Sequence, residues 1–105
     1  MRYLIVGQHP PDLCPSANAT VRKLSAEGAG EVPALAESLG VTLLDTYVPM
    51  HNHMVFAAVE ADDIDAVREF VFQSRLGQWN TLEIYPVVTL QEALTKVNEL
   101  PTIYG

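Results

Sequence analysis

The chain has 105 residues, 49% of them hydrophobic, which suits one compact domain over residues 1–105 and leaves no room for a second. Thirteen acidic residues against six scattered basic ones give a net charge of -7. Such a surface repels phosphate groups and argues against nucleic acid and membranes as partners.

The amino-terminal stretch MRYLIVGQHPP contains an apolar run that is too short for a signal peptide or a membrane span. The only cysteine, Cys14, has no partner for an internal disulfide, which agrees with a reducing compartment. We therefore expect a cytoplasmic location.

The first half of the chain predicts a strand followed by a long helix. Residues 2–8 are rich in strand-forming side chains, and the prolines that follow forbid regular structure. A helix can begin after Ser16 or Asn18, since both are good amino-terminal caps. Its apolar positions recur at helical spacing: Val21, Leu24, Gly28, Val32, Leu35 and Leu39. Because Gly30 and Pro33 interrupt this face, we expect a kink or two shorter helices near Gly30.

The second half predicts two strands, a helix and a further strand. Residues 41–49 and 53–61 read as strands joined by a hairpin. Asp62 can cap the helix that follows. That helix carries its apolar positions at Ile64, Val67, Phe70 and Val71. The last strand lies within residues 79–88, and Pro86 places it at a sheet edge.

A short helix ends the pattern, opened by a capping box between Thr89 and Glu92. The order of elements is then β-α-β-β-α-β plus this helix, which predicts a ferredoxin-like α+β fold. Right-handed crossovers give a four-stranded antiparallel sheet with strand order 4-1-3-2 and helices on one face.

The face of the sheet without helices is also expected to be apolar. Alternation places Tyr3 and Ile5 on one side of the first strand and Leu4 and Val6 on the other, so that both sides are apolar. An open sheet with two apolar faces needs a partner, so we expect a homodimer that forms sheet to sheet. Three tyrosines are assigned to this interface: Tyr3, Tyr47 and Tyr85.

Three stretches carry a family resemblance: GVTLLDTYV, HMVFAAVEADD and RLGQWNTLEIYPVVTLQEAL. On these the chain resembles the dimeric α/β-barrel superfamily, and within it short bacterial domain families without an assigned function. The resemblance implies a ferredoxin-like domain that pairs sheet to sheet. Relatives in that superfamily include cofactor-free monooxygenases, haem-degrading enzymes, lactone isomerases, metal-binding domains and effector-binding modules.

The predicted topology brings four metal-binding side chains to one edge of the sheet: His9, Cys14, His51 and His53. Imidazole and thiolate are ligands that zinc, copper or nickel favour. The His-x-His pair, if extended, directs both rings to the same face. Asp12 can serve as a fourth ligand or as a hydrogen-bond acceptor for an imidazole.

Two other interpretations of these residues stay open. The histidines can simply fill a solvated turn, since loops gather polar residues. Cys14 precedes the first helix, whose amino terminus stabilises a thiolate, so a Cys-His pair can also perform nucleophilic or redox chemistry. Alternatively Cys14 is a small buried thiol packed between prolines.

A second group of candidate residues joins the second helix to the last strand. Arg75, Trp79 and Asn80 can wall a ligand pocket at the same edge, with the arginine holding an anionic group. Trp79 is otherwise a core residue over the sheet, and Arg75 a partner of a carboxylate.

The sequence thus favours a small binding domain that holds a transition metal or a small ligand at the edge cluster. A cofactor-free enzyme is the alternative, with a pocket between the sheet and its helices and a histidine as acid or base. A structural or interaction protein, whose function is its dimer surface, is the third.

Overall fold

Four strands form a single antiparallel sheet in the computed structural model, which describes all 105 residues. They are β1 (Arg2–Gln8), β2 (Thr42–Tyr47), β3 (Met54–Glu60) and β4 (Thr81–Val87). The strand order is β2-β3-β1-β4, and each neighbouring pair is antiparallel. This is the predicted order read from the other edge, so the predicted α+β architecture is confirmed. Pro86 lies on β4, an edge strand, as expected.

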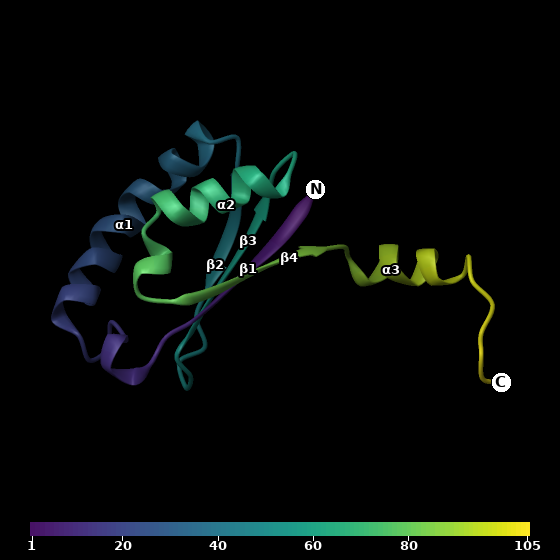
Figure 1. The fold of residues 1–105 in the computed structure, drawn as a ribbon, viewed down its shortest axis with the longest axis horizontal. Helices are drawn as coiled ribbons and strands as arrows, with labels where there is room; N and C mark the ends of the chain where they lie inside the picture. Colours follow the sequence, from purple (N-terminus) through teal and green to yellow (C-terminus); the bar gives the residue numbers. More distant parts are fainter.

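Two helices cover one face of this sheet, and a third projects from the body. These are α1 (Ala19–Ser38), α2 (Ile64–Gln73) and α3 (Leu90–Val97). Two single-turn 3-10 segments, η1 (Pro11–Leu13) and η2 (Leu76–Gln78), lie in the connections. Figure 1 shows α1 and α2 on the same side, while α3 continues outward from the end of β4. None of the helices combines the length and the hydropathy needed to cross a bilayer.

Side-chain caps fix where the helices begin. The Asn18 side chain accepts a hydrogen bond from the Val21 amide at 3.0 Å, so Asn18 rather than Ser16 is the cap of α1. The cap of α2 is Asp63, whose carboxylate accepts from the Ala66 amide at 2.9 Å. The predicted cap, Asp62, was wrong by one residue because neighbouring aspartates offer the same chemistry and sequence alone does not choose between them.

The expected break in the first helix is absent. Helix α1 runs for 20 residues through Gly30 and Pro33. A proline in a helix interior costs about 3 kcal/mol. Apolar side chains on both sides of it, Val32 and Leu35, pack against the core, as does Leu39 one turn later. Packing of this face therefore outweighs the unfavourable backbone.

The core lies between the sheet and the helices. Tyr3 and Ile5 on β1 are paired with Val59 and Ala57 on β3, and all four are buried. They meet buried side chains from both covering helices: Ala36, Val67, Phe70 and Val71. Tyr3 is only 3% exposed on this side, so its assignment to an intermolecular interface was wrong. Strand alternation places it with Ile5, under the helices.

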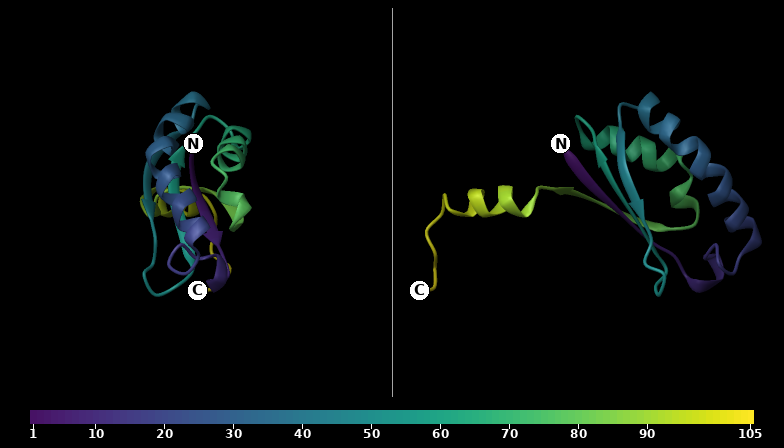
Figure 2. Two further views of the ribbon diagram at one scale, coloured as in Figure 1. Left: turned by 90° about the vertical axis from the view of Figure 1, so that its left-hand side faces the viewer. Right: turned by 180° about the vertical axis from the view of Figure 1, so that it is seen from behind.

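The opposite face of the sheet is uncovered in this chain. Leu4 and Val6 lie there half-buried, and Tyr47 and Tyr85 are 57% and 45% exposed. Helix α3 has no buried residue, and the body with this helix extends over 54 × 32 × 17 Å (Figure 2). Homodimerisation stays a prediction.

Candidate functional site

Two histidines are held side by side at the end of the β1–β3 ladder. His9 directly follows β1 and His53 directly precedes β3. The last pair in register is Gln8 with Met54, and the next backbone hydrogen bond runs from the His9 amide to the His53 carbonyl at 3.2 Å. The ring centroids lie 5.7 Å apart in an edge-to-face arrangement. The sheet therefore fixes the spacing of these two rings.

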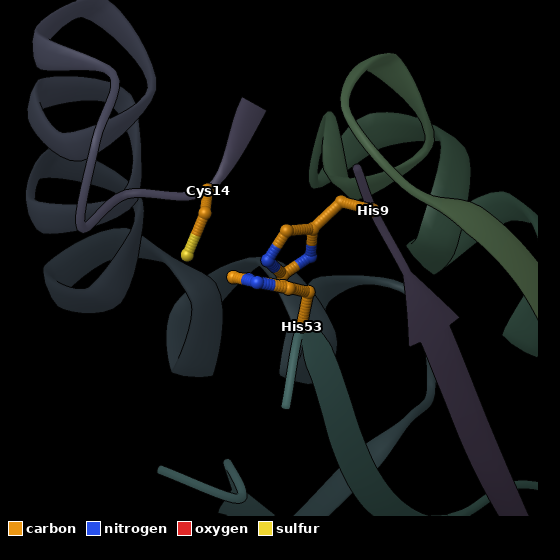
Figure 3. A group of neighbouring side chains, drawn as sticks. All are labelled: His9, Cys14 and His53. Atoms are coloured by element: carbon orange, nitrogen blue, oxygen red, sulfur yellow. The ribbon is translucent and has the colours of Figure 1, made fainter. Parts of the chain in front are cut away.

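Cys14 reaches the histidine pair from the loop between β1 and α1. The loop is tied to α1 by the Arg22 guanidinium, which donates to the carbonyls of Pro15 and Ser16 at 2.7 and 2.9 Å. One ligand atom from each of His9, Cys14 and His53 lies within 4.8 Å of the others, and Figure 3 shows the three side chains converging. By geometry, such atoms share a point no more than about 2.8 Å from each, close to the metal–ligand distances of about 2.0–2.3 Å in zinc sites.

A buried asparagine sets the orientation of His9. Asn80 donates its side-chain N–H to the Leu76 carbonyl at 3.1 Å, so its Oδ1 faces His9. That oxygen lies 2.8 Å from His9 Nδ1. An amide oxygen only accepts hydrogen bonds, so Nδ1 must carry the proton and Nε2 presents its lone pair. Acceptors behind the ring orient metal-binding histidines in the same way.

Two ring nitrogens of the cluster are buried without a hydrogen-bond partner. They are His9 Nε2 and His53 Nδ1, and the His9 side chain belongs to a residue only 8% exposed. A buried polar atom left unpaired costs about 1–3 kcal/mol. Both nitrogens belong to the two rings that converge with Cys14, in the group whose ligand atoms lie within 4.8 Å of one another.

The surroundings of Cys14 favour its thiolate. Hydrogen bonds from the Ser16 side chain and backbone, and then the nearby rings of His53 and His9, lower the pKa of Cys14 from 9.0 to about 6. The Ser16 hydroxyl lies 3.0 Å from the sulfur. The thiolate, which is the form that binds metals and attacks electrophiles, therefore predominates at neutral pH.

The cluster forms part of the wall of a large cavity. Its volume is about 650 Å³, and it lies between α1 and the covered face of the sheet, with Phe70 of α2 also in its wall. Pockets that hold small molecules have volumes of about 300–1,000 Å³. The Ser25 hydroxyl of α1 also lines it and is buried without a hydrogen-bond partner.

His51 does not join the cluster. It is exposed, and although it lines the cavity its ring is not among the three that converge. Residues 50–53 form a turn and bend, whereas the expectation that both histidines face one way assumed an extended backbone. Asp12 is exposed and also lies outside the group.

The second group of candidates is divided by the structure. Trp79 lines the cavity, with its ring centroid 5.0 Å from that of His9. Asn80 lies behind His9 instead of in the cavity wall. Arg75 is exposed, donates to the Gln78 side chain at 2.8 Å and is not a lining residue. A ligand role for Trp79 stays a prediction.

Sequence reasoning expected a pocket between the sheet and its helices only for the enzyme alternative, and it missed Ser25 as a lining residue. The signal was available in the stretch SAEGAG, residues 25–30, where small side chains replace the bulky ones expected on a packed helix. Gly28 lines the cavity, and a Cβ added there would meet no atom within 4 Å.

Residues 1–101 match the family described as a domain of unknown function, DUF3303. Because the match covers nearly the whole chain, the chain belongs to this family. No curated protein matches the chain significantly.

Proposed function

We propose that this member of the DUF3303 family binds a transition metal ion, such as zinc, copper or nickel, through His9, Cys14 and His53. Two imidazoles and one thiolate suit these metals. In a tetrahedral zinc site, bond lengths of about 2.0–2.3 Å separate the ligand atoms by roughly 3.3–3.8 Å. The three donors lie within 4.8 Å of one another, so closure needs a movement of about 1 Å.

The observation that carries this proposal is the pair of unpartnered nitrogens beside a thiolate. His9 is already in the tautomer that binds a metal through Nε2, because Asn80 holds its other nitrogen. A metal ion would pair with both buried nitrogens and with the Cys14 sulfur, and so remove an unfavourable feature of the empty site.

Three protein ligands leave one coordination position of a tetrahedral ion free. Structural zinc sites are normally closed by four protein ligands, whereas sites that bind or convert small molecules keep one position open. The cluster lines the cavity, so the free position would be accessible from it.

The proposal is tested by elemental analysis of untagged protein and by titration with zinc, copper and nickel. We expect near-stoichiometric binding, lost at least tenfold in His9→Ala, Cys14→Ala and His53→Ala. His51→Ala is the matched control, since it removes an imidazole from the same hairpin outside the cluster. Metal-free protein without affinity for any of the three ions would refute the proposal, as would an equal loss in His51→Ala.

The cavity also favours a second candidate, a cofactor-free enzyme of the dimeric α/β-barrel type. His9 Nε2 is an unprotonated nitrogen in the wall of a pocket that can hold a small molecule, as a general base requires. The two candidates differ in their need for metal. Turnover or ligand binding that persists in fully chelated protein, and is lost in His9→Ala, would favour the enzyme.

We also propose that the open face of the sheet pairs with a second copy of the chain. An eight-residue helix is marginal by itself in water, yet α3 exposes Leu90, Leu94 and Val97 away from its own body. The open face offers the apolar surface that such a helix needs. Two copies related by a two-fold axis can cover both surfaces at once.

A further inference from the structure

The lining of the cavity is mostly apolar. Of its 26 lining residues none is Asp, Glu, Lys or Arg, although these types make up 18% of the chain. No arginine or lysine is present there to hold a phosphate, and more than half of the lining residues are hydrophobic. This lining favours a ligand that is mostly apolar over nucleotides and other highly charged compounds.

Three residues that line this apolar space carry buried polar atoms without a partner. His9 Nε2 and His53 Nδ1 lie at the metal-binding cluster, and the Ser25 hydroxyl lies on α1. His9 is more than nine-tenths buried, so water is a poor substitute partner. This arrangement fits a ligand with an apolar body and a single polar head group.

The charge of that head group follows from the cluster. A divalent ion bound by two neutral imidazoles and one thiolate keeps one positive charge, and no Asp, Glu, Lys or Arg lies in the cavity wall to balance it. Apolar surroundings strengthen the attraction of such a centre for one anion. We infer that the cavity binds a small apolar monocarboxylic acid whose carboxylate occupies the free coordination position of the metal. This inference rests on the proposed function.

Gly28 offers a way to close the cavity without touching the metal ligands. A side chain added at Gly28 would enter the cavity, where nothing lies within 4 Å of its Cβ. Gly30 is the matched control, since it lies on the same helix, is equally unobstructed and does not line the cavity. Leucine favours a helix more than glycine does, so both substitutions are compatible with the fold.

The experiment uses the full chain loaded with cobalt(II), which replaces zinc and reports its coordination by visible absorption. The probes are octanoate, its neutral methyl ester, and acetate, which lacks the apolar body. We expect octanoate to change the cobalt spectrum and the fluorescence of Trp79, the only tryptophan. It should bind at least tenfold more tightly than either other probe.

The variants decide where octanoate binds. Gly28→Leu should bind cobalt normally and lose at least tenfold in octanoate affinity, while Gly30→Leu should keep both. Cobalt binding without a response to octanoate would overturn the inference and leave the proposed metal site intact. Equal octanoate affinity in Gly28→Leu, or equal binding of the methyl ester, would also overturn it. Failure of the proposed function would already be visible as an absence of cobalt binding before any probe is added.

Discussion

The two faces of the sheet are built from the same strands and differ in what they hold. On the covered face, Ile5 and Val59 are buried under helices, and the polar groups gather around one cavity. On the open face, Leu4 and Val6 alternate with them and are half-buried, because no helix covers them in this chain. Strand alternation thus produces two apolar surfaces with different pockets. The covered face has the larger one, about 650 Å³ with the His9–Cys14–His53 cluster in its wall, and the open face has a pocket of about 310 Å³ with Glu83 in its wall.

The proposed binding site and the proposed dimer interface therefore lie on different faces of the sheet. The covered face supplies the cavity and, where β1 and β3 end, the His9–Cys14–His53 cluster, while the open face has no such cluster of metal-binding side chains. Substitutions on the open face should therefore affect association and leave the site unchanged, and those under the helices should affect folding or binding.

The largest effects are expected when an aspartate replaces a valine of the sheet, on stability at the covered face and on dimerisation at the open face. Val59 is 0% exposed, so Val59→Asp should lower the free energy of unfolding by more than about 4 kcal/mol. Val6→Asp, its counterpart on the open face, should cost the single chain about 1 kcal/mol or less and abolish the dimer. Urea unfolding measures the free energy of unfolding, and light scattering measures whether the dimer forms. A dimer that survives Val6→Asp would contradict the proposed pairing of open faces.

The next effect concerns Asn80, which supports the cluster from behind. Asn80→Ala removes the acceptor of His9 Nδ1 without removing a ligand, so metal affinity should fall about 10–100-fold. Loss of this buried amide should also cost about 1–3 kcal/mol of stability. Asn98→Ala, at the end of α3, is the control for loss of an amide. Unchanged metal affinity in a folded Asn80→Ala protein would show that His9 needs no orientation.

A smaller effect is expected on the reactivity of Cys14 in metal-free protein. The pKa of Cys14 is about 6 in the folded protein, against an ordinary value of 9.0. The Cys14 thiolate therefore stabilises the folded state fully above pH 9, and this contribution to stability is lost as the pH falls towards 6. Alkylation by iodoacetamide should be half-maximal near pH 6. Ser16→Ala removes the largest cause and should move the midpoint upward, whereas Ser25→Ala should not. An unmoved midpoint in Ser16→Ala would assign the low pKa to the backbone amide at position 16 and to the histidines.

The smallest effect is expected from the projecting helix. Leu94 is exposed in the single chain, so Leu94→Ser should change its free energy of unfolding by less than about 0.5 kcal/mol. If α3 packs on a second copy, the same substitution should weaken the dimer measurably in sedimentation experiments. An unaltered dissociation constant of the dimer would place α3 outside the interface.

Periodicity in the sequence was sufficient to predict the fold. The alternation in residues 2–8 depends on local chemistry and is found as expected. Thr89 caps α3 as expected by accepting from the Glu92 amide, but the Glu92 carboxylate accepts from the Thr89 hydroxyl instead of from the Thr89 amide, so only half of the capping box forms. Continuity of α1 through Pro33 was not predictable, because it depends on packing between segments that are distant in sequence.

The candidate site was predictable in part. His9, Cys14 and His53 were named from topology, since strand order alone brings them to one edge. The exclusion of His51 was not predictable, because one residue in a turn reverses the direction of a side chain. The position of Asn80 behind His9 depends on its bond to the Leu76 carbonyl, a tertiary detail without a sequence pattern.

The backbone hydrogen bond between His9 and His53 has a kinetic consequence. The sheet presents these two ligands as a rigid pair, whereas Cys14 belongs to a loop. An arriving ion would meet the histidines first and be enclosed in a second step by the sulfur. Prolines at positions 10, 11 and 15 restrict the loop, which lowers the entropy lost on enclosure. Motion of the loop would then determine how long an ion stays bound. The fixed position of the histidines at the ends of the strands would determine how fast it is captured.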